Sequence, residues 1–139
     1  MASDTTPPFE GYAIYDPVDP FENRAGPFYW KHLPDCTHHF ALRATERHCN
    51  SHGIVHGGLM MTMIDLSMVI ACKGTDGEQL VTISINSDFI AAGHAGGIIE
   101  AHGTVTRRTR TLAFVTGRVE SQGRTLLTAS GVFKTLYRA

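Results

Sequence analysis

The longest apolar run in the chain, from Gly57 to Cys72, limits the folds that this sequence can adopt. The run is rich in Leu, Met and Ile, is too long for a typical strand, and precedes Gly74, a residue type that often ends helices. Because the run is apolar on nearly all sides, we predict a helix over residues 57–73 that is surrounded by protein. A membrane span is not indicated, since about 20 apolar residues are needed and Asp65 lies mid-run.

Segments typical of strands lie on both sides of this helix in the sequence. Two precede it, separated by a turn at Pro34-Asp35, and four follow it. Turns are predicted between the last four at Gly93/Gly96, at Thr109/Arg110 and at Gln122-Gly123. The predicted strands cover residues 28–33, 37–45, 80–90, 97–106, 111–121 and 125–136, and residues 46–56 are predicted to form a loop.

The segment 80–90 has the plainest alternation of apolar and polar residues. Its apolar residues are predicted to lie on one face and its polar residues on the other, namely Val81, Ile83 and Ile85 against Thr82, Ser84 and Asn86. One long buried helix with antiparallel strands predicts an α+β domain, an antiparallel sheet wrapped around one long central helix. Because a single helix covers one face of a sheet, we expect the other face and the edges to make subunit contacts.

The length and composition fit a single domain with a real core. The chain has 139 residues, of which 42% are hydrophobic and 18% are charged. Five of its six prolines fall within the first 27 residues, which predicts an irregular or extended arm with at most a short turn of helix. We therefore expect an N-terminal arm over residues 1–27 and a domain over residues 28–139.

Charge and cysteine usage exclude several classes of function. The formal net charge is -1, so there is no basic footprint for nucleic acid or for an anionic membrane surface. The three cysteines, Cys36, Cys49 and Cys72, have no CxxC spacing and do not suggest a disulfide framework. A signal peptide is not indicated either, because the first residues are acidic and proline-containing. We expect a protein of the reducing cytoplasm, without nucleic-acid or membrane partners.

The residues from Asn50 to Asp65 carry the strongest chemical signal. If the helix begins near Gly57, its first N–H groups point outward at the positive end of the helix dipole. Gly57 and Gly58 allow a ligand oxygen to approach the backbone closely, and Asn50 can add a side-chain N–H. Such donors suit the negative charge that develops on a thioester carbonyl. Asp65 lies about two turns further on, among apolar residues, and is a candidate base.

These residues resemble the phenylacetic-acid-degradation (PaaI-like) branch of the hot-dog thioesterase superfamily. The resemblance covers roughly the last two-thirds of the chain and leaves out the proline-rich arm. The matching motif is Asn50-x-x-Gly53-x-Val55-His56-Gly57-Gly58-Leu59, followed after five residues by Asp65. It implies a hot-dog fold and an acyl-coenzyme A thioesterase that releases free acid and coenzyme A.

The resemblance also implies a role for each site residue. The Gly57 amide and the Asn50 side chain polarise the thioester carbonyl, and His56, with Gly58 beside it, helps to hold the loop and the substrate. Asp65 comes from the other subunit of a dimer and attacks the carbonyl or activates water. Thr82 positions the water or the acid. A homodimer or a homotetramer (a dimer of dimers) is implied, with no cofactor and no metal.

One departure from the family pattern concerns the turn before residue 111. Relatives often have a basic residue followed by glycine there, whereas this chain has Arg107, Arg108 and Arg110. Three arginines at one turn are a candidate site for coenzyme A phosphates.

Other chemistries fit the sequence less well. His48, His52 and His56 recur every four residues, but glycines interrupt any helix there, so a zinc site is not predicted. No G-x-S-x-G elbow occurs. A hot-dog acyl-CoA dehydratase or hydratase and a non-catalytic acyl-CoA-binding module stay open as alternatives. The expected substrate is a small aryl or medium-chain acyl-CoA.

Overall fold

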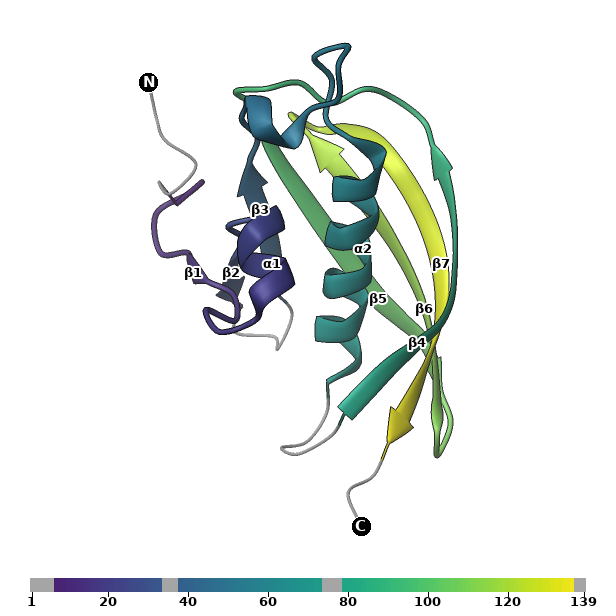
Figure 1. Ribbon diagram of the computed structural model, residues 1–139. Helices are drawn as coiled ribbons and strands as arrows, with labels where there is room; N and C mark the ends of the chain where they lie inside the picture. Colours follow the sequence, from purple (N-terminus) through teal and green to yellow (C-terminus); the bar gives the residue numbers. More distant parts are fainter. Residues whose placement is uncertain (1–6, 34–37, 74–78, 137–139) are drawn as a thin grey trace.

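The computed structural model describes residues 7–33, 38–73 and 79–136, and it consists of one sheet that curls around one long helix (Figure 1). This is the α+β architecture that the sequence predicts. The predicted turn residues Pro34 and Asp35 and the predicted cap Gly74 lie outside the described residues. The elements are β1 (Ala13–Ile14), α1 (Pro20–Ala25), β2 (Tyr29–His32), β3 (His38–Arg43), the 3₁₀ turn η1 (Glu46–His48), α2 (Gly57–Cys72), β4 (Gln79–Phe89), β5 (Ile98–Arg108), β6 (Leu112–Ser121) and β7 (Arg124–Leu136).

The sheet has the strand order β1-β2-β3-β5-β6-β7-β4, and every neighbouring pair is antiparallel. The strand β4 follows α2 in the sequence but pairs with β7 at the far edge, so the sheet wraps around the helix (Figure 1). The β6–β7 connection is the predicted two-residue turn, in which Gln122 and Gly123 both have positive φ. The six predicted strands correspond to β2–β7, and the ends of each predicted range lie within two residues of the ends of the observed strand.

The helix α2 begins at Gly57, as predicted, and most of its side chains are buried in the core. One stripe keeps access to solvent, and its residues are spaced three or four apart, as expected for one face of a helix. The stripe consists of Gly58, Met61, Thr62, Asp65 and Val69. The prediction of a helix surrounded by protein is therefore wrong for this face within a single chain. No helix in the described ranges has the length and apolar character needed to cross a bilayer.

Two glycines let α2 lie directly on the sheet backbone. Gly103 of β5 and Gly117 of β6 are opposite each other in the ladder. A Cβ atom at Gly103 would lie 2.8 Å from the Ser67 carbonyl oxygen, and one at Gly117 would lie 2.7 Å from Ile64 Cδ1. Both distances are too short for real contacts. A larger residue at Gly103 would meet helix backbone and force the helix away from the sheet, whereas one at Gly117 would require the Ile64 side chain to move.

A β-bulge changes the predicted faces of β4. The register with β7 shifts between Thr82 and Ser84, where one extra residue is inserted. Thr82 is paired with the buried Phe133, and Ile85 is paired with Gly131 two residues before it. Paired residues share a face, so Thr82 and Ile85 both face α2. The prediction that they lie on opposite faces is wrong, because the extra residue reverses the alternation.

The N-terminal segment joins the sheet and contacts α2. β1 pairs with β2, and Tyr15 belongs to the core. The helix α1 is short and begins with an Asp19 cap followed by Pro20, as expected for a helix N-terminus. Its C-terminal end is held by the loop before α2, because Arg47 and His48 both donate hydrogen bonds to the Gly26 carbonyl oxygen.

We predict that Gly103→Ala destabilises the fold by about 1–3 kcal/mol, because the added methyl group meets helix backbone rather than a movable side chain. Thr116→Ala is the control, since Thr116 is exposed and lies one residue from Gly117. Urea unfolding of both variants measures the difference. A Gly103→Ala protein as stable as the wild type would show that α2 does not rest on this strand.

Candidate active site

The loop before α2 is organised by the side chain of Asn50. Its Oδ1 atom accepts hydrogen bonds from the backbone N–H groups of His52 (2.9 Å) and Ile54 (3.4 Å). The Nδ2 group donates to no residue in the part of the chain that the structure describes. Asn50 therefore caps the loop with its oxygen and keeps two N–H donors for another acceptor.

The first turn of α2 leaves one backbone donor open. The Gly58 N–H donates to the Nδ1 atom of His56 (2.8 Å), and the N–H groups of Leu59 and Met60 donate to the His56 carbonyl oxygen (3.0 and 3.3 Å). The Gly57 N–H has no acceptor among the described residues. Because it lies at the positive end of the helix, it is the backbone donor best suited to a developing negative charge.

These hydrogen bonds define the roles of two predicted binding residues, Gly58 and His56. Gly58 cannot offer its N–H to a substrate, because the His56 ring already accepts it. A Cβ atom at Gly58 would lie 2.9 Å from that ring, so the glycine instead makes room for the cap. His56 holds the loop from both sides, since its own N–H donates to the His48 carbonyl oxygen (2.9 Å).

Asp65 and Thr82 form the second half of the candidate site. The Thr82 hydroxyl donates a 2.6 Å hydrogen bond to Asp65 Oδ1. Such a short contact is typical of a hydroxyl that bonds a carboxylate. The β4 bulge makes this contact available by turning Thr82 toward α2. One carboxylate oxygen is thus oriented, and the other is left to accept a proton.

A cleft of about 540 Å³ opens beside this pair, between α1, α2 and β4. Its polar wall includes Asp65 and Thr82. Its apolar wall is formed by Phe21, Met61, Leu66 and Ile85. Asp19 and Glu22 of α1 also line it, so the arm that the family resemblance does not cover forms part of the cleft. The sequence signals α1 itself through the Asp19-Pro20 cap, but not the surface on which α1 packs.

The two halves of the candidate site are far apart within one chain. Gly57 and Asp65 are eight residues apart on the same helix, which corresponds to about 12 Å along its axis. A carbonyl oxygen and the water that attacks its carbon lie within about 3–3.5 Å of one another. This separation along α2 disfavours the use of both groups of one chain on the same thioester.

The predicted arginine cluster lies at the other end of α2. The β5–β6 hairpin that carries it is near the C-terminal end of the helix, whereas Gly57 begins the helix (Figure 1). Arg108 donates a hydrogen bond to the Cys72 carbonyl oxygen and so stabilises the last turn of α2. Arg107 is exposed and makes no contact of this kind with the described residues. Of the three, Arg107 is thus the best candidate for a phosphate contact.

Comparison with known proteins identifies similar thioesterases and a similar esterase. The model of the thioesterase superfamily matches residues 52–128. PA0474, a proposed esterase of Pseudomonas aeruginosa, is 31% identical over 126 residues, which cover 89% of this chain and 94% of that protein. The mouse (Mus musculus) acyl-coenzyme A thioesterase 13 is 28% identical over 92 residues, which cover 60% of this chain and 66% of that protein.

A solved structure extends the similarity to the fold. A single-residue mutant of the phenylacetic acid degradation protein PaaI from Thermus thermophilus is 26% identical, with a TM-score of 0.74. The match covers 85% of this chain and all of the other (100%). The predicted resemblance is confirmed, and the chain belongs to the thioesterase superfamily.

Proposed function

We propose that this protein hydrolyses acyl-coenzyme A thioesters to free acids and coenzyme A, with small aryl or medium-chain acyl groups as substrates. The observation that carries the proposal is the pair of half-sites on α2, an open helix N-terminus and a carboxylate oriented by Thr82. The apolar wall of the cleft is of a size and character that suit such acyl groups. Family membership supports thioester hydrolysis over the alternative of a non-catalytic binding module.

In the proposed mechanism the carbonyl oxygen binds to the Gly57 N–H and the Asn50 Nδ2 group, which stabilise the charge that develops on it. Asp65 takes a proton from water, whose oxygen attacks the carbonyl carbon, or it attacks that carbon itself. Thr82 fixes one Asp65 oxygen and so directs the other toward the reacting atoms.

A dehydratase would instead need a base beside the carbon next to the carbonyl. Parallel assays of thiol release and of enoyl-CoA hydration distinguish the two reactions.

We further propose a site shared between the subunits of a homodimer, in which Gly57 and Asn50 of one chain face Asp65 and Thr82 of its partner. The separation of about 12 Å along α2 supports this arrangement, as does the open stripe on that helix. The edge strand β4 carries the exposed apolar residues Val81, Ile83 and Phe89, which suit a subunit contact. Pairing of two such dimers gives the tetramer. We place the protein in the cytoplasm, because its cysteines have no spacing typical of a disulfide framework.

We expect Asp65→Asn to keep the fold and to lower kcat by at least ~100-fold, because a catalytic base or nucleophile is lost. Asp88→Asn is the matched control, since Asp88 is an exposed carboxylate on β4. Steady-state thiol release from a panel of acyl-CoAs gives the rates. Near-wild-type turnover by folded Asp65→Asn protein would remove Asp65 from the mechanism.

A shared site predicts that two inactive variants restore activity when they are mixed. Asn50→Asp keeps the oxygen that caps the loop but removes the N–H donors, and Asp65→Asn removes the carboxylate of the other half-site. Random co-assembly makes half of the dimers mixed, each with one intact site, so about a quarter of wild-type activity returns. Failure of refolded mixtures to regain activity, or an active monomer in sedimentation, would exclude the shared site.

We also expect Arg107→Ala to raise KM for acyl-CoA several-fold and to leave KM unchanged for a short thioester that lacks the nucleotide. Arg108→Ala is the contrasting variant, because it removes a helix contact and should lower thermal stability instead. The wild-type KM for acyl-CoA should rise with salt. If Arg107→Ala affects both substrates equally, the coenzyme A phosphates bind elsewhere.

A further inference from the structure

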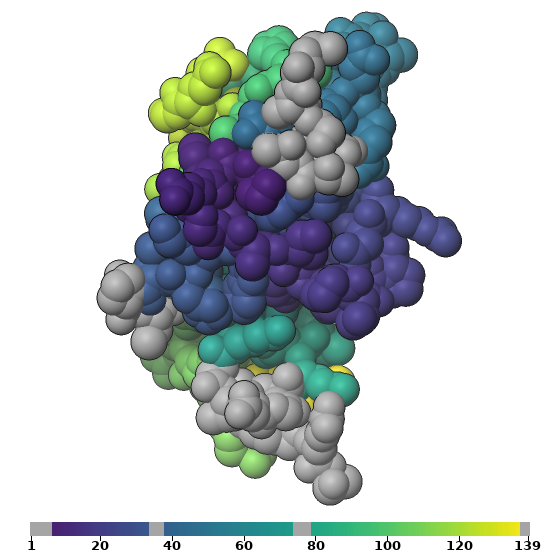
Figure 2. All heavy atoms as spheres, turned by 90° about the vertical axis from the view of Figure 1, so that its left-hand side faces the viewer, coloured from purple at the N-terminus to yellow at the C-terminus, as the bar shows by residue number. Residues whose placement is uncertain are grey.

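The N-terminal helix α1 is held over the open stripe of α2. The N-terminal segment, in purple, extends across the middle of this face of the molecule (Figure 2). Arg47 donates hydrogen bonds to the carbonyl oxygens of Arg24 (2.8 Å) and Gly26, and His48 Nε2 lies 2.8 Å from the same Gly26 oxygen. These contacts fix the end of α1, so the side chains that α1 directs into the cleft have a defined position.

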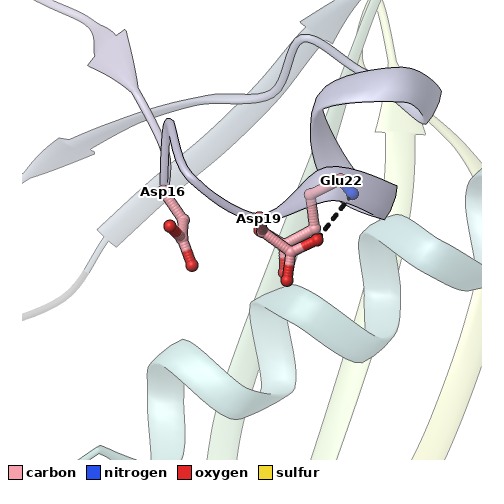
Figure 3. A group of neighbouring side chains, drawn as sticks. All are labelled: Asp16, Asp19 and Glu22. Atoms are coloured by element: carbon pink, nitrogen blue, oxygen red, sulfur yellow. Dashed lines mark hydrogen bonds between the residues drawn. The ribbon is translucent and has the colours of Figure 1, made fainter.

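Three carboxyl groups of this segment gather beside α2 (Figure 3). Oxygen atoms of Asp16, Asp19 and Glu22 all lie within 4.8 Å of one another. Two of the groups have structural partners: Asp19 accepts the Glu22 N–H as the helix cap (2.8 Å), and Asp16 accepts the Val18 N–H (3.3 Å). The Glu22 carboxyl has none, and its Oε2 atom is buried without a hydrogen-bond partner in the described ranges.

The surroundings of Glu22 favour its protonated form. Burial raises the pKa of its carboxyl to about 7, and the negative charges of Asp19, Asp16 and Asp65 act in the same direction. Lys73 at the end of α2 opposes them but is outweighed. The raised pKa favours the protonated carboxyl of Glu22, which lines the same cleft as Asp65 and Thr82.

We propose that Glu22 is a further catalytic residue of thioester hydrolysis, the acid that protonates the departing sulfur. This inference rests on the proposed function. Asp65 takes one proton from water, the water oxygen bonds to the carbonyl carbon, and the carbon–sulfur bond breaks. The electron pair of that bond takes the proton of Glu22, which gives the free thiol. Asp65 then releases its proton to solvent and Glu22 takes one up, so that both groups return to their starting forms, one water is consumed, and one acid and one thiol are formed.

Two carboxyl groups in one cleft can act as acid and base, respectively, when their environments differ. The Thr82 hydroxyl donates a hydrogen bond to Asp65, whereas Glu22 lies among like charges and accepts no hydrogen bond from the described residues. An acid must be protonated to act, so kcat/KM should decline as pH rises through about 7. Glu22→Gln should lack this decline, because an amide does not titrate there.

The decisive experiment varies the leaving group. The wild type, Glu22→Gln and Asp65→Asn are assayed with two thioesters of the same acyl group, one of N-acetylcysteamine and one of 4-nitrothiophenol. The second thiol is acidic enough to leave without a proton. We expect Glu22→Gln to lower kcat ~100-fold on the first thioester and less than about threefold on the second. Asp65→Asn should lower both, and Glu10→Gln, an exposed acid of the same arm, should lower neither.

Thermal unfolding tests the protonation state without an activity assay. A carboxyl whose pKa rises on folding contributes stability that is fully present below its unfolded pKa and is lost as pH rises from the unfolded to the folded value. The melting temperature of Glu22→Gln minus that of the wild type should therefore increase between about pH 4.5 and about pH 7 and then level off.

Several results would overturn the inference. Equal losses by Glu22→Gln on both thioesters, or no loss on either, would exclude proton donation to sulfur while the proposed function stands. A melting difference that does not change with pH would show that folding does not raise the Glu22 pKa, so that Glu22 is ionised at neutral pH and cannot act as the acid. A wild type that hydrolyses neither thioester and releases no thiol from any acyl-CoA would remove the proposed function, and this inference with it.

Discussion

The close packing of α2 on the sheet is the constraint on which the rest of the molecule depends. Gly103 and Gly117 bring the helix to the backbone of β5 and β6, and the sheet then curls until β4 reaches the other side of the helix. With α2 at this depth, Thr82 is within 2.6 Å of Asp65. A thicker layer between helix and sheet would separate the two side chains that orient the candidate base.

The helix α2 also carries the candidate oxyanion donor and the candidate base at two separate positions. Its first turn keeps the Gly57 N–H open because the His56 ring and carbonyl oxygen take the next three donors. The carboxylate follows two turns later, about 12 Å away. A rigid helix cannot fold back on itself, so the separation between donor and carboxylate is fixed. Subunit pairing is the simplest way to combine both ends of two such helices at one substrate.

The N-terminal arm adds chemistry that the family motif does not contain. Its helix is short, and none of its side chains is fully buried. Its position depends on Arg47 and His48, which bind its last carbonyl groups from the loop before α2. Through these contacts the arm contributes Phe21 and Glu22 to the cleft of the candidate base.

The sequence by itself determined the order and type of α2 and of the strands β2 to β7, because the apolar run of α2 and the turn residues between strands are local signals. It did not predict β1 or η1. It also identified the candidate site residues: Asn50, Gly57 and Asp65 belong to one motif, and the resemblance to the thioesterase family points to Thr82. Only the tertiary structure decided which donors stay open, which face Thr82 occupies and where α1 packs. A bulge, a hydrogen bond already made and a docked helix depend on partners distant in the sequence, and no local pattern encodes those partners.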